Sequence, residues 1–280
     1  MKEITKSILE NSVDFHVHVS PDPYTERVVN IYEAALQAKN IGMRGIVIKS
    51  HYYPTAPIVL LTKENVEGIE IIGSLALNHS IGGINPYAVE ASAKMGAKVI
   101  WMPTVSSVAV RNKKGLSDGI PIIGDNGKVL PDVKEILSLV RENDLILCTG
   151  HLTTDEIIPL FSEALDMKVN KFVVTHPLKV AGTSIDLNIQ KELAERGAFI
   201  EHCFGATFSL RESLDPFKIV EAIKFVGVDR CILSTDFGKF HKPLLADGMR
   251  IMLATLFECG LSEQELTILV KKNPYQLLNL

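Results

Sequence analysis

The sequence has 280 residues, enough for two ordinary domains or for one α/β barrel, which typically needs about 250 residues. Apolar residues make up 46% and charged residues 22% of the chain, as is normal for a globular protein with a large core. The formal net charge of −4 provides no electrostatic basis for binding nucleic acid or an anionic membrane. We therefore expect a small-molecule partner.

The expected location is the cytoplasm. The four cysteines, Cys148, Cys203, Cys231 and Cys259, are far apart and form no CxxC pair, which favours free thiols in a reducing compartment. The first 15 residues lack the apolar core of a signal peptide. No apolar stretch approaches the roughly 20 residues that span a bilayer.

Short apolar, β-branched runs alternate with longer segments of helical spacing along the whole chain. These runs predict strands at 13–18, 45–49, 69–76, 98–103, 145–149, 171–175, 198–203 and 230–235. Near-continuous apolar strands are typical of a parallel sheet covered by helices, and eight such units favour a closed barrel. No glycine-rich phosphate-binding motif follows the first strand, which argues against a doubly wound dinucleotide-binding sheet. We predict an α/β protein with a (β/α)8 barrel, and one domain over residues 1–280.

The interval between the fourth and fifth strands, 104–144, is longer than the others. It contains Asn126-Gly127 between apolar residues, a pattern typical of a β-hairpin turn. We therefore expect a hairpin-containing insertion after strand four. It would emerge at the catalytic face, either as a lid over the site or as an ordinary surface loop.

The histidines are concentrated at the carboxyl ends of the predicted strands. Seven of the eight lie there: His16, His18, His51, His79, His151, His176 and His202. Active sites of (β/α)8 barrels are built at this face, and random placement would put only about one histidine there. Any one of these histidines could be an ordinary core or loop residue, but the set of seven indicates a functional site.

His16 and His18 carry the most specific signal. Alternation along a strand points both side chains to one face, where two imidazoles can bind a single divalent cation. Asp14 precedes them on the same predicted face and could support the site. An HxH triplet alone is weak evidence for a metal site, because it often occurs by chance. Its position on the first strand makes the evidence stronger.

The other candidates follow in chain order: His151 after strand five, His176 after strand six and Asp236 after strand eight. This series resembles the amidohydrolase superfamily of metal-dependent hydrolases, on the elements DFHVHVSPD, GHLTTDE, VTHPL and STDFG. The closing segment LSEQELTILVKKNPYQLLNL is similar to the last helix of those barrels, so the resemblance spans the whole chain.

The resemblance implies metal-ligand roles for His16, His18 and Asp236, with His151 as a third imidazole ligand. His176 would bind a second metal or stabilise charge on the substrate, and Asp236 would also carry the proton from the attacking water. The cofactor would be a divalent ion, Zn²⁺ first, with Mn²⁺, Fe²⁺ and Ni²⁺ as alternatives.

The chain departs from the two-metal pattern at strand four. Two-metal members carry a carboxylated lysine or a glutamate there, whereas this strand reads VIWMPT, with Trp101, Met102 and Pro103, and offers no such ligand. We therefore favour one ion. A second ion stays open, because Lys49 on strand two or Glu201 on strand seven could supply a bridge.

Lys49 and His51 share a face at the end of strand two, where a lysine needs a partner or a polar cavity. Lys49 would contact substrate or a carboxylate such as Glu201, although a lysine at a strand end can also extend to solvent. We expect the substrate-binding set to be His51, Asn78, His79, Glu201 and His202. Cationic loop residues on the same face, among them Arg111, Lys113, Lys114 and His241, are compatible with an anionic substrate, although solvated loop charges are the more common explanation of such a group.

The expected activity is hydrolysis of an amide, a lactone or ester, or a phosphoester, with Asp236, His176 and Lys49 as catalytic residues. A one-metal decarboxylase, a metal-independent lactonase and a non-catalytic metabolite-binding barrel are the alternatives. Barrels of this kind often self-associate, so a homo-oligomer is compatible with the sequence.

Overall fold

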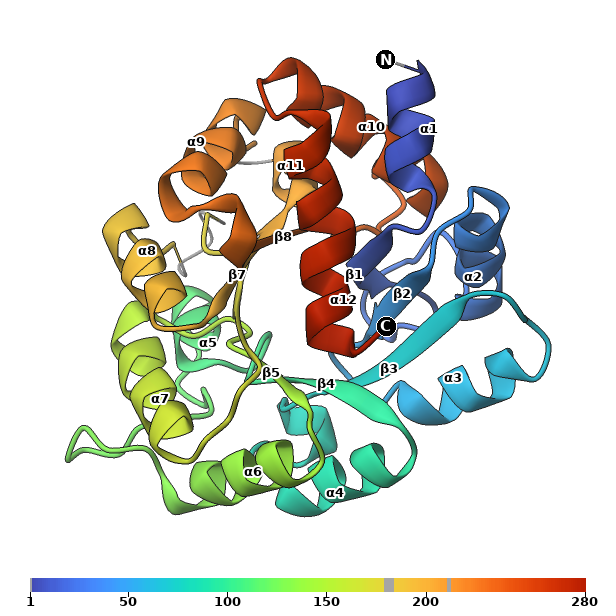
Figure 1. Ribbon diagram of the computed structural model, residues 1–280. Helices are drawn as coiled ribbons and strands as arrows, with labels where there is room; N and C mark the ends of the chain where they lie inside the picture. Colours follow the sequence, from blue (N-terminus) through green and yellow to red (C-terminus); the bar gives the residue numbers. More distant parts are fainter. Residues whose placement is uncertain (1, 179–183, 211–212) are drawn as a thin grey trace.

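A computed structural model describes residues 2–178, 184–210 and 213–280 (Figure 1). Within these ranges, eight parallel strands form one sheet whose order follows the sequence. They are β1 (Val13–His18), β2 (Gly45–Lys49), β3 (Glu70–Ala76), β4 (Ala97–Trp101), β5 (Ile146–Cys148), β6 (Phe172–Thr175), β7 (Phe199–Cys203) and β8 (Cys231–Ser234). Each bound lies within two residues of the strand that the apolar pattern predicts.

Helices alternate with the strands and surround the sheet (Figure 1). The α-helices are α1 (Lys2–Leu9), α2 (Ile31–Asn40), α3 (Ala56–Lys63), α4 (Pro86–Lys94), α5 (Val108–Lys113), α6 (Pro131–Glu142), α7 (Thr154–Asp166), α8 (Leu187–Glu195), α9 (Pro216–Val226), α10 (Leu245–Glu258), α11 (Glu263–Thr267) and α12 (Asn273–Leu278). Four shorter helical segments are η1 (His79–Ile81), η2 (Phe204–Phe208), η3 (Val228–Arg230) and the π-helical η4 (Ile268–Lys272). Over the described ranges, no helix has both the length and the apolar character needed to cross a bilayer.

The sheet closes where its first strand meets the segment after its last. Val17 and Phe237 form a parallel bridge, and the His18 N–H donates to the carbonyl oxygen of Phe237 at 2.9 Å. The N–H of Asp236 donates to the carbonyl oxygen of His16 at 3.0 Å. The predicted (β/α)8 barrel is confirmed.

The barrel interior is a packed core that α12 seals from the end where the strands begin. Phe15 and Trp101 belong to this interior core, together with Leu277 and Leu278 of α12. The side chain of Asn273 donates to the carbonyl oxygen of Cys231, at the start of β8, at 2.7 Å. Figure 1 shows α12 crossing the middle of the ring of strands. The opposite end, where the strands terminate, is left for the functional site.

The insertion after β4 contains the expected hairpin. An antiparallel bridge joins Ile123 to Val129, and the N–H of Gly127, at φ +71°, donates to the carbonyl oxygen of Gly124 at 2.9 Å. In Figure 1 this green hairpin, between α5 and α6, projects outward past α7, away from the barrel centre. The hairpin part of the insertion therefore lies at the periphery of the barrel.

Candidate metal centre

Two histidines of β1 point into the mouth of the barrel. A bulge between Asp14 and Val17 interrupts the regular pairing of β1 with β2. Phe15 lies in the interior core, while the rings of His16 and His18 have their centroids 5.2 Å apart. Both histidines are buried. They therefore form a close pair of imidazoles at the end of the first strand.

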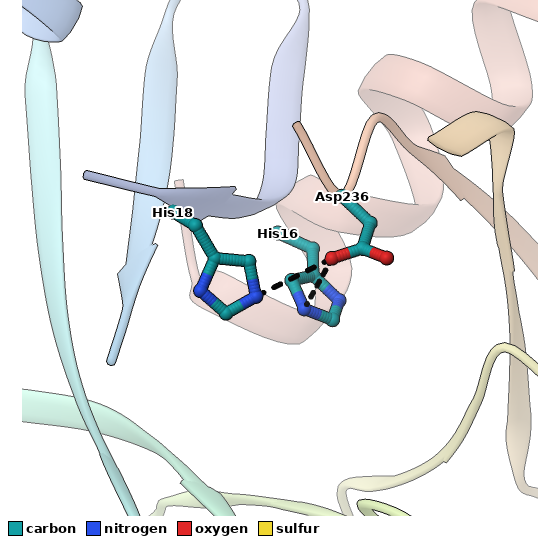
Figure 2. Close-up of side chains that lie close together, drawn as sticks. All are labelled: His16, His18 and Asp236. Carbon is teal, nitrogen blue, oxygen red and sulfur yellow. Dashed lines mark ion pairs between the residues drawn. The ribbon is translucent and has the colours of Figure 1, made fainter. Parts of the chain in front are cut away.

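Asp236, after β8, completes a group of three metal-ligating side chains (Figure 2). Its Oδ1 lies 3.5 Å from Nε2 of His16 and 3.3 Å from Nε2 of His18. One donor atom from each residue falls within 4.8 Å of the other two. Two imidazole nitrogens and a carboxylate oxygen are a donor set that Zn²⁺ and other first-row divalent ions accept.

Burial keeps the two imidazoles neutral. Loss of solvation lowers the pKa of His16, and the charge of Lys49 lowers it further. Loss of solvation also lowers the pKa of His18 well below its ordinary value, against the opposing effect of Asp236. A neutral imidazole offers a lone pair to a cation, whereas an imidazolium does not. The protonation states of this group therefore fit a divalent cation.

The backbone around Asp236 ties the ends of the sheet together. Asp236 has φ +51°, a left-handed conformation that is costly for a residue other than glycine, and Nζ of Lys242 donates to its carbonyl oxygen at 2.8 Å. At Gly238, φ is +133° and an added Cβ would lie 2.0 Å from the carbonyl oxygen of His18. The STDFG segment can therefore pass β1 this closely only with glycine at position 238.

The ring of His16 is held at both nitrogens. Nδ1 lies 3.1 Å from Oε1 of Glu201 on β7 and 3.6 Å from Sγ of Cys203. Nε2 lies 3.1 Å from Nζ of Lys49, the last residue of β2, and this ammonium lies 4.6 Å from the centre of the Trp101 ring. A carboxylate accepts and an ammonium donates, so both contacts favour the tautomer with its proton on Nδ1.

β4 places an aromatic ring beside the metal group. Trp101 is fully buried, and its ring centroid is 5.5 Å from that of His16.

A second cluster of metal-ligating side chains in the described ranges combines His16 with Glu201 and Cys203. The two polar side chains considered for a bridge, Lys49 and Glu201, thus both contact His16.

Five histidines form a closed ring of imidazoles around the barrel mouth, which we call the histidine ring. From the His16–His18 pair it continues to His51, 4.8 Å from His18, and to His151, 6.0 Å from His51. His176 lies 5.0 Å from His151 and 6.0 Å from His16, all distances being between ring centroids. The structure thus brings the four predicted imidazole ligands, His16, His18, His151 and His176, close together. His51, which was predicted to bind substrate, lies between His18 and His151.

Asp14 does not join the histidines, contrary to the expectation that it shares their face. Its Oδ1 accepts hydrogen bonds from the N–H of Thr235 at 3.0 Å and of His16 at 3.2 Å, and its Oδ2 accepts from the Thr235 hydroxyl. Burial raises its pKa to about 7 against these donors. The bulge in β1 breaks the alternation on which the expectation rested. Asp14 therefore fastens β1 to the end of β8.

Asn78 connects the loops that follow β2, β3 and β4. Its amide nitrogen donates to the carbonyl oxygen of His51 at 2.9 Å and to the hydroxyl of Thr104 at 2.7 Å. Its Oδ1 accepts from the N–H groups of Thr104 and Ser106 at 2.9 and 3.1 Å. The Thr104 hydroxyl also lies 2.8 Å from Nδ1 of His51. The Asn78 side chain therefore holds the loops of His51 and Thr104 in place beside the metal group.

The remaining predicted histidines lie outside the histidine ring. His79 is exposed, with Nε2 2.8 Å from the carbonyl oxygen of Asp118. His202 is buried and lines a small cavity with His176, and neither of its ring nitrogens has a hydrogen-bond partner among the described residues. Burial lowers the pKa of His202 to about 3. It follows Glu201 on β7, so alternation turns it to the other face of the strand.

Sequence reasoning missed two features of this site. Cys203 lies two residues after Glu201, and period-two alternation could have placed its thiol beside the same imidazole. The Asn78 connection gives no such signal, because three of its four side-chain hydrogen bonds go to main-chain groups of loops whose course the sequence does not predict.

Solved structures of several enzymes share this fold. An amidohydrolase from Pseudomonas aeruginosa superposes with a TM-score of 0.66 at 13% identity, over 99% of this chain and 98% of that one. The dipeptidase AC, a metallopeptidase of family M19, gives a TM-score of 0.65 at 12% identity, over 96% and 98%. A 2,6-dihydroxybenzoate decarboxylase from Rhizobium gives 0.57 at 12% identity, over 96% and 99%. The chain therefore shares the barrel fold of these three enzymes.

Sequence comparison defines the family. No curated protein matches the chain at a significant level. The profile of a family of unknown function, DUF6282, matches residues 11–201, and the chain belongs to this family. The matched segment includes the HxH pair and Glu201 and ends before Asp236.

Proposed function

We propose that this protein is a metal-dependent hydrolase that cleaves an amide, a lactone or ester, or a phosphoester of a small anionic molecule. The observation that carries the proposal is the convergence of His16, His18 and Asp236 at the barrel mouth, where burial lowers the pKa of both imidazoles. Barrels of the same fold include an amidohydrolase and a metallopeptidase, which supports this class of reaction.

The ion would be held by His16, His18 and Asp236, with His151 and His176 as further ligands from the histidine ring. Zn²⁺ suits these donors best, and Mn²⁺, Fe²⁺ and Ni²⁺ accept the same set. We favour one ion, because β4 ends in an aromatic ring and offers no bridging ligand.

When bound, a divalent ion acidifies water and polarises a carbonyl or phosphoryl oxygen. Asp236 would accept the proton released by the attacking water and return it to the leaving group. Lys49, a buried cation, and His176 would stabilise the negative charge that develops on the substrate oxygen.

The other polar residues of the mouth would bind or position. We assign substrate contact to His51 in the histidine ring and to His79, which lines a neighbouring cavity. Glu201 and Asn78 would act through the groups that they hold, namely His16 and the loop of His51. His202 would contribute only if substrate entered the small cavity that it shares with His176.

A one-metal decarboxylase is the second candidate. It is favoured by Trp101 in place of a bridging ligand, and by the shared fold of a decarboxylase. Product analysis in ¹⁸O-water separates the two reactions, since only hydrolysis incorporates solvent oxygen. For location we propose the cytoplasm, because none of the four cysteines forms a disulfide bond in the described ranges and three are buried.

The proposal is tested by elemental analysis of chain purified without chelator, joined to a screen of amides, lactones and phosphoesters. We expect about one ion per chain in the wild type and loss of that ion in the double variant His16→Ala/His18→Ala. His241→Ala is the matched control, because His241 belongs neither to the three-residue group nor to the histidine ring and should leave metal content unchanged. Less than about 0.1 ion per chain, with no activity on adding Zn²⁺ or Mn²⁺, would overturn the proposal.

A further inference from the structure

A second cavity, which we call the side cavity, opens between the loops that follow the first four strands. Its volume is about 590 Å³, within the range of sites for small organic ligands. The residues that matter for its chemistry are Tyr24, Tyr52, His79, Ser106, Arg111 and Lys114. They come from the four segments that follow β1, β2, β3 and β4 at the barrel mouth, the face that carries the metal group.

The side cavity adjoins the metal group through one imidazole. The ring centroid of Tyr52 lies 6.0 Å from that of His51, which lies 4.8 Å from that of His18. Asn78, which also lines the cavity, holds the carbonyl oxygen of His51. A small molecule in the side cavity can therefore extend toward the candidate ligands.

The charges around the side cavity favour an anion. Its described lining contains two cations, Arg111 and Lys114, and no carboxylate. Nε and Nη2 of Arg111 donate to the two carboxylate oxygens of Asp118 at 2.7 and 2.5 Å, which fixes the guanidinium plane. Nη1 of Arg111 makes no hydrogen bond to a described residue, and Lys114 forms no ion pair with one. The guanidinium of Arg111 is therefore held in a fixed orientation, and its Nη1 can still donate to a ligand. The ammonium of Lys114 adds a second positive charge to the same cavity.

Two tyrosines, whose ring planes are tilted by 57° to each other, give the side cavity an aromatic wall. The rings of Tyr24 and Tyr52 have their centroids 4.8 Å apart. Tyr24 is 79% exposed, although its loop is anchored: Oδ1 of Asp22 accepts from the Tyr24 N–H at 3.0 Å, and Arg27 donates to Oδ2 at 2.6 Å. An exposed aromatic ring on a fixed loop is suited to ligand contact, because little conformational entropy is lost on binding.

From these features we infer that the side cavity binds a remote carboxylate of the substrate. Arg111 and Lys114 would hold this carboxylate, and the two tyrosines would contact a flat or aromatic portion of the molecule. The substrate class is then an organic acid whose reacting group lies at the other end, toward His18. The reaction assigned to this acid rests on the proposed function, whereas the binding of the carboxylate does not.

The test is calorimetric titration of the full-length protein with benzoate and with benzamide, its neutral analogue of the same shape. We expect benzoate to bind at least tenfold more tightly than benzamide. Lys114→Gln should weaken benzoate about tenfold and leave benzamide nearly unchanged. Arg111→Gln should weaken benzoate more, since it also leaves the carboxylate of Asp118 unneutralised. Lys113→Gln is the matched control, because this neighbouring exposed lysine does not line the cavity.

His18→Ala separates the side cavity from the metal group. If benzoate binds in the side cavity, this variant keeps its affinity and its dependence on Lys114. The inference is overturned if wild type fails to bind benzoate at millimolar concentration, if Lys114→Gln and Arg111→Gln bind it as wild type does, or if His18→Ala abolishes binding. A chain that binds benzoate through Lys114 but holds no metal would overturn the proposed function and leave the side cavity assignment standing.

Discussion

Nδ1 of His16 lies 3.1 Å from the buried carboxylate of Glu201, and this contact decides which nitrogen of the ring faces Asp236. With the proton of the imidazole on Nδ1, the lone pair on Nε2 points to the group that Asp236 and His18 complete. Carboxylates that orient a ligating imidazole in this way raise its basicity as well as fixing its direction.

Glu201→Gln should therefore lower metal affinity about tenfold to a hundredfold without removing a ligand of the three-residue group. The neutral amide no longer stabilises the Nδ1–H of His16. Competition with a chromogenic chelator measures the affinity. Glu195→Gln, an exposed glutamate of α8, is the control and should bind metal as wild type does. Equal affinities for the two variants would show that Glu201 has no positioning role.

Asp236→Asn should retain metal and lose turnover. The two imidazoles and the amide oxygen still bind the ion, but an amide cannot take up the proton that hydrolysis releases. We expect kcat to fall by about 10² to 10⁴, with metal content unchanged by elemental analysis. Asp229→Asn, in the exposed turn before β8, should leave kcat unchanged. Near-wild-type turnover in Asp236→Asn would remove this residue from the mechanism.

Gly238→Ala should disrupt the metal group, whereas Gly197→Ala should not. Both glycines have positive φ, +133° and +113°, so both substitutions strain the backbone. Only at position 238 would the new Cβ meet another group, the carbonyl oxygen of His18 at 2.0 Å. We expect Gly238→Ala to lower unfolding free energy by about 2 kcal/mol more than Gly197→Ala, and to weaken metal binding. Urea denaturation and chelator competition measure both effects, and similar behaviour of the two variants would contradict the clash.

His202→Leu should reduce the amount by which the free energy of unfolding falls between pH 7 and pH 5. The pKa of His202 is about 3 in the folded chain, against 6.5 for an ordinary histidine. Between these values the unfolded chain binds a proton that the folded chain does not, so stability falls as pH drops through 6.5 toward 3. At pH 5 the expected contribution is about 2 kcal/mol, and leucine removes it.

Urea unfolding at pH 7 and pH 5, with chelator throughout, tests this contribution. His241→Gln, at a partly exposed histidine of the loop after β8, is the control and should change the pH dependence much less than His202→Leu does. An unchanged difference between pH 7 and pH 5 in His202→Leu would show that His202 accepts its proton in the folded chain.

The barrel could be predicted from sequence because its strands are apolar on both faces. Every predicted run corresponds to a strand, and Asn126-Gly127 lies in a hairpin, because these signals depend only on local spacing and on turn chemistry. His16, His18 and Asp236 could be brought together on the same basis, since the ends of parallel strands in a barrel meet at one face.

Contacts that depend on register could not be predicted. Asp14 was expected beside the histidines, but one bulge in β1 changes which side chains share a face. The contact between His16 and Glu201 joins residues 185 positions apart, and it requires knowing how β1 and β7 face each other across the barrel. The order of the histidine ring likewise depends on loop conformations after β2, β5 and β6.

The position of α12 also has a consequence for synthesis. Leu277 and Leu278 fill the base of the barrel, so the interior is sealed by residues that a ribosome adds after all eight strands. Until then a nascent chain exposes apolar rings such as Phe15 and Trp101, which are the kind of surface that chaperones bind. Although His16 is made early, the site to which it belongs can be finished only when this late segment has docked.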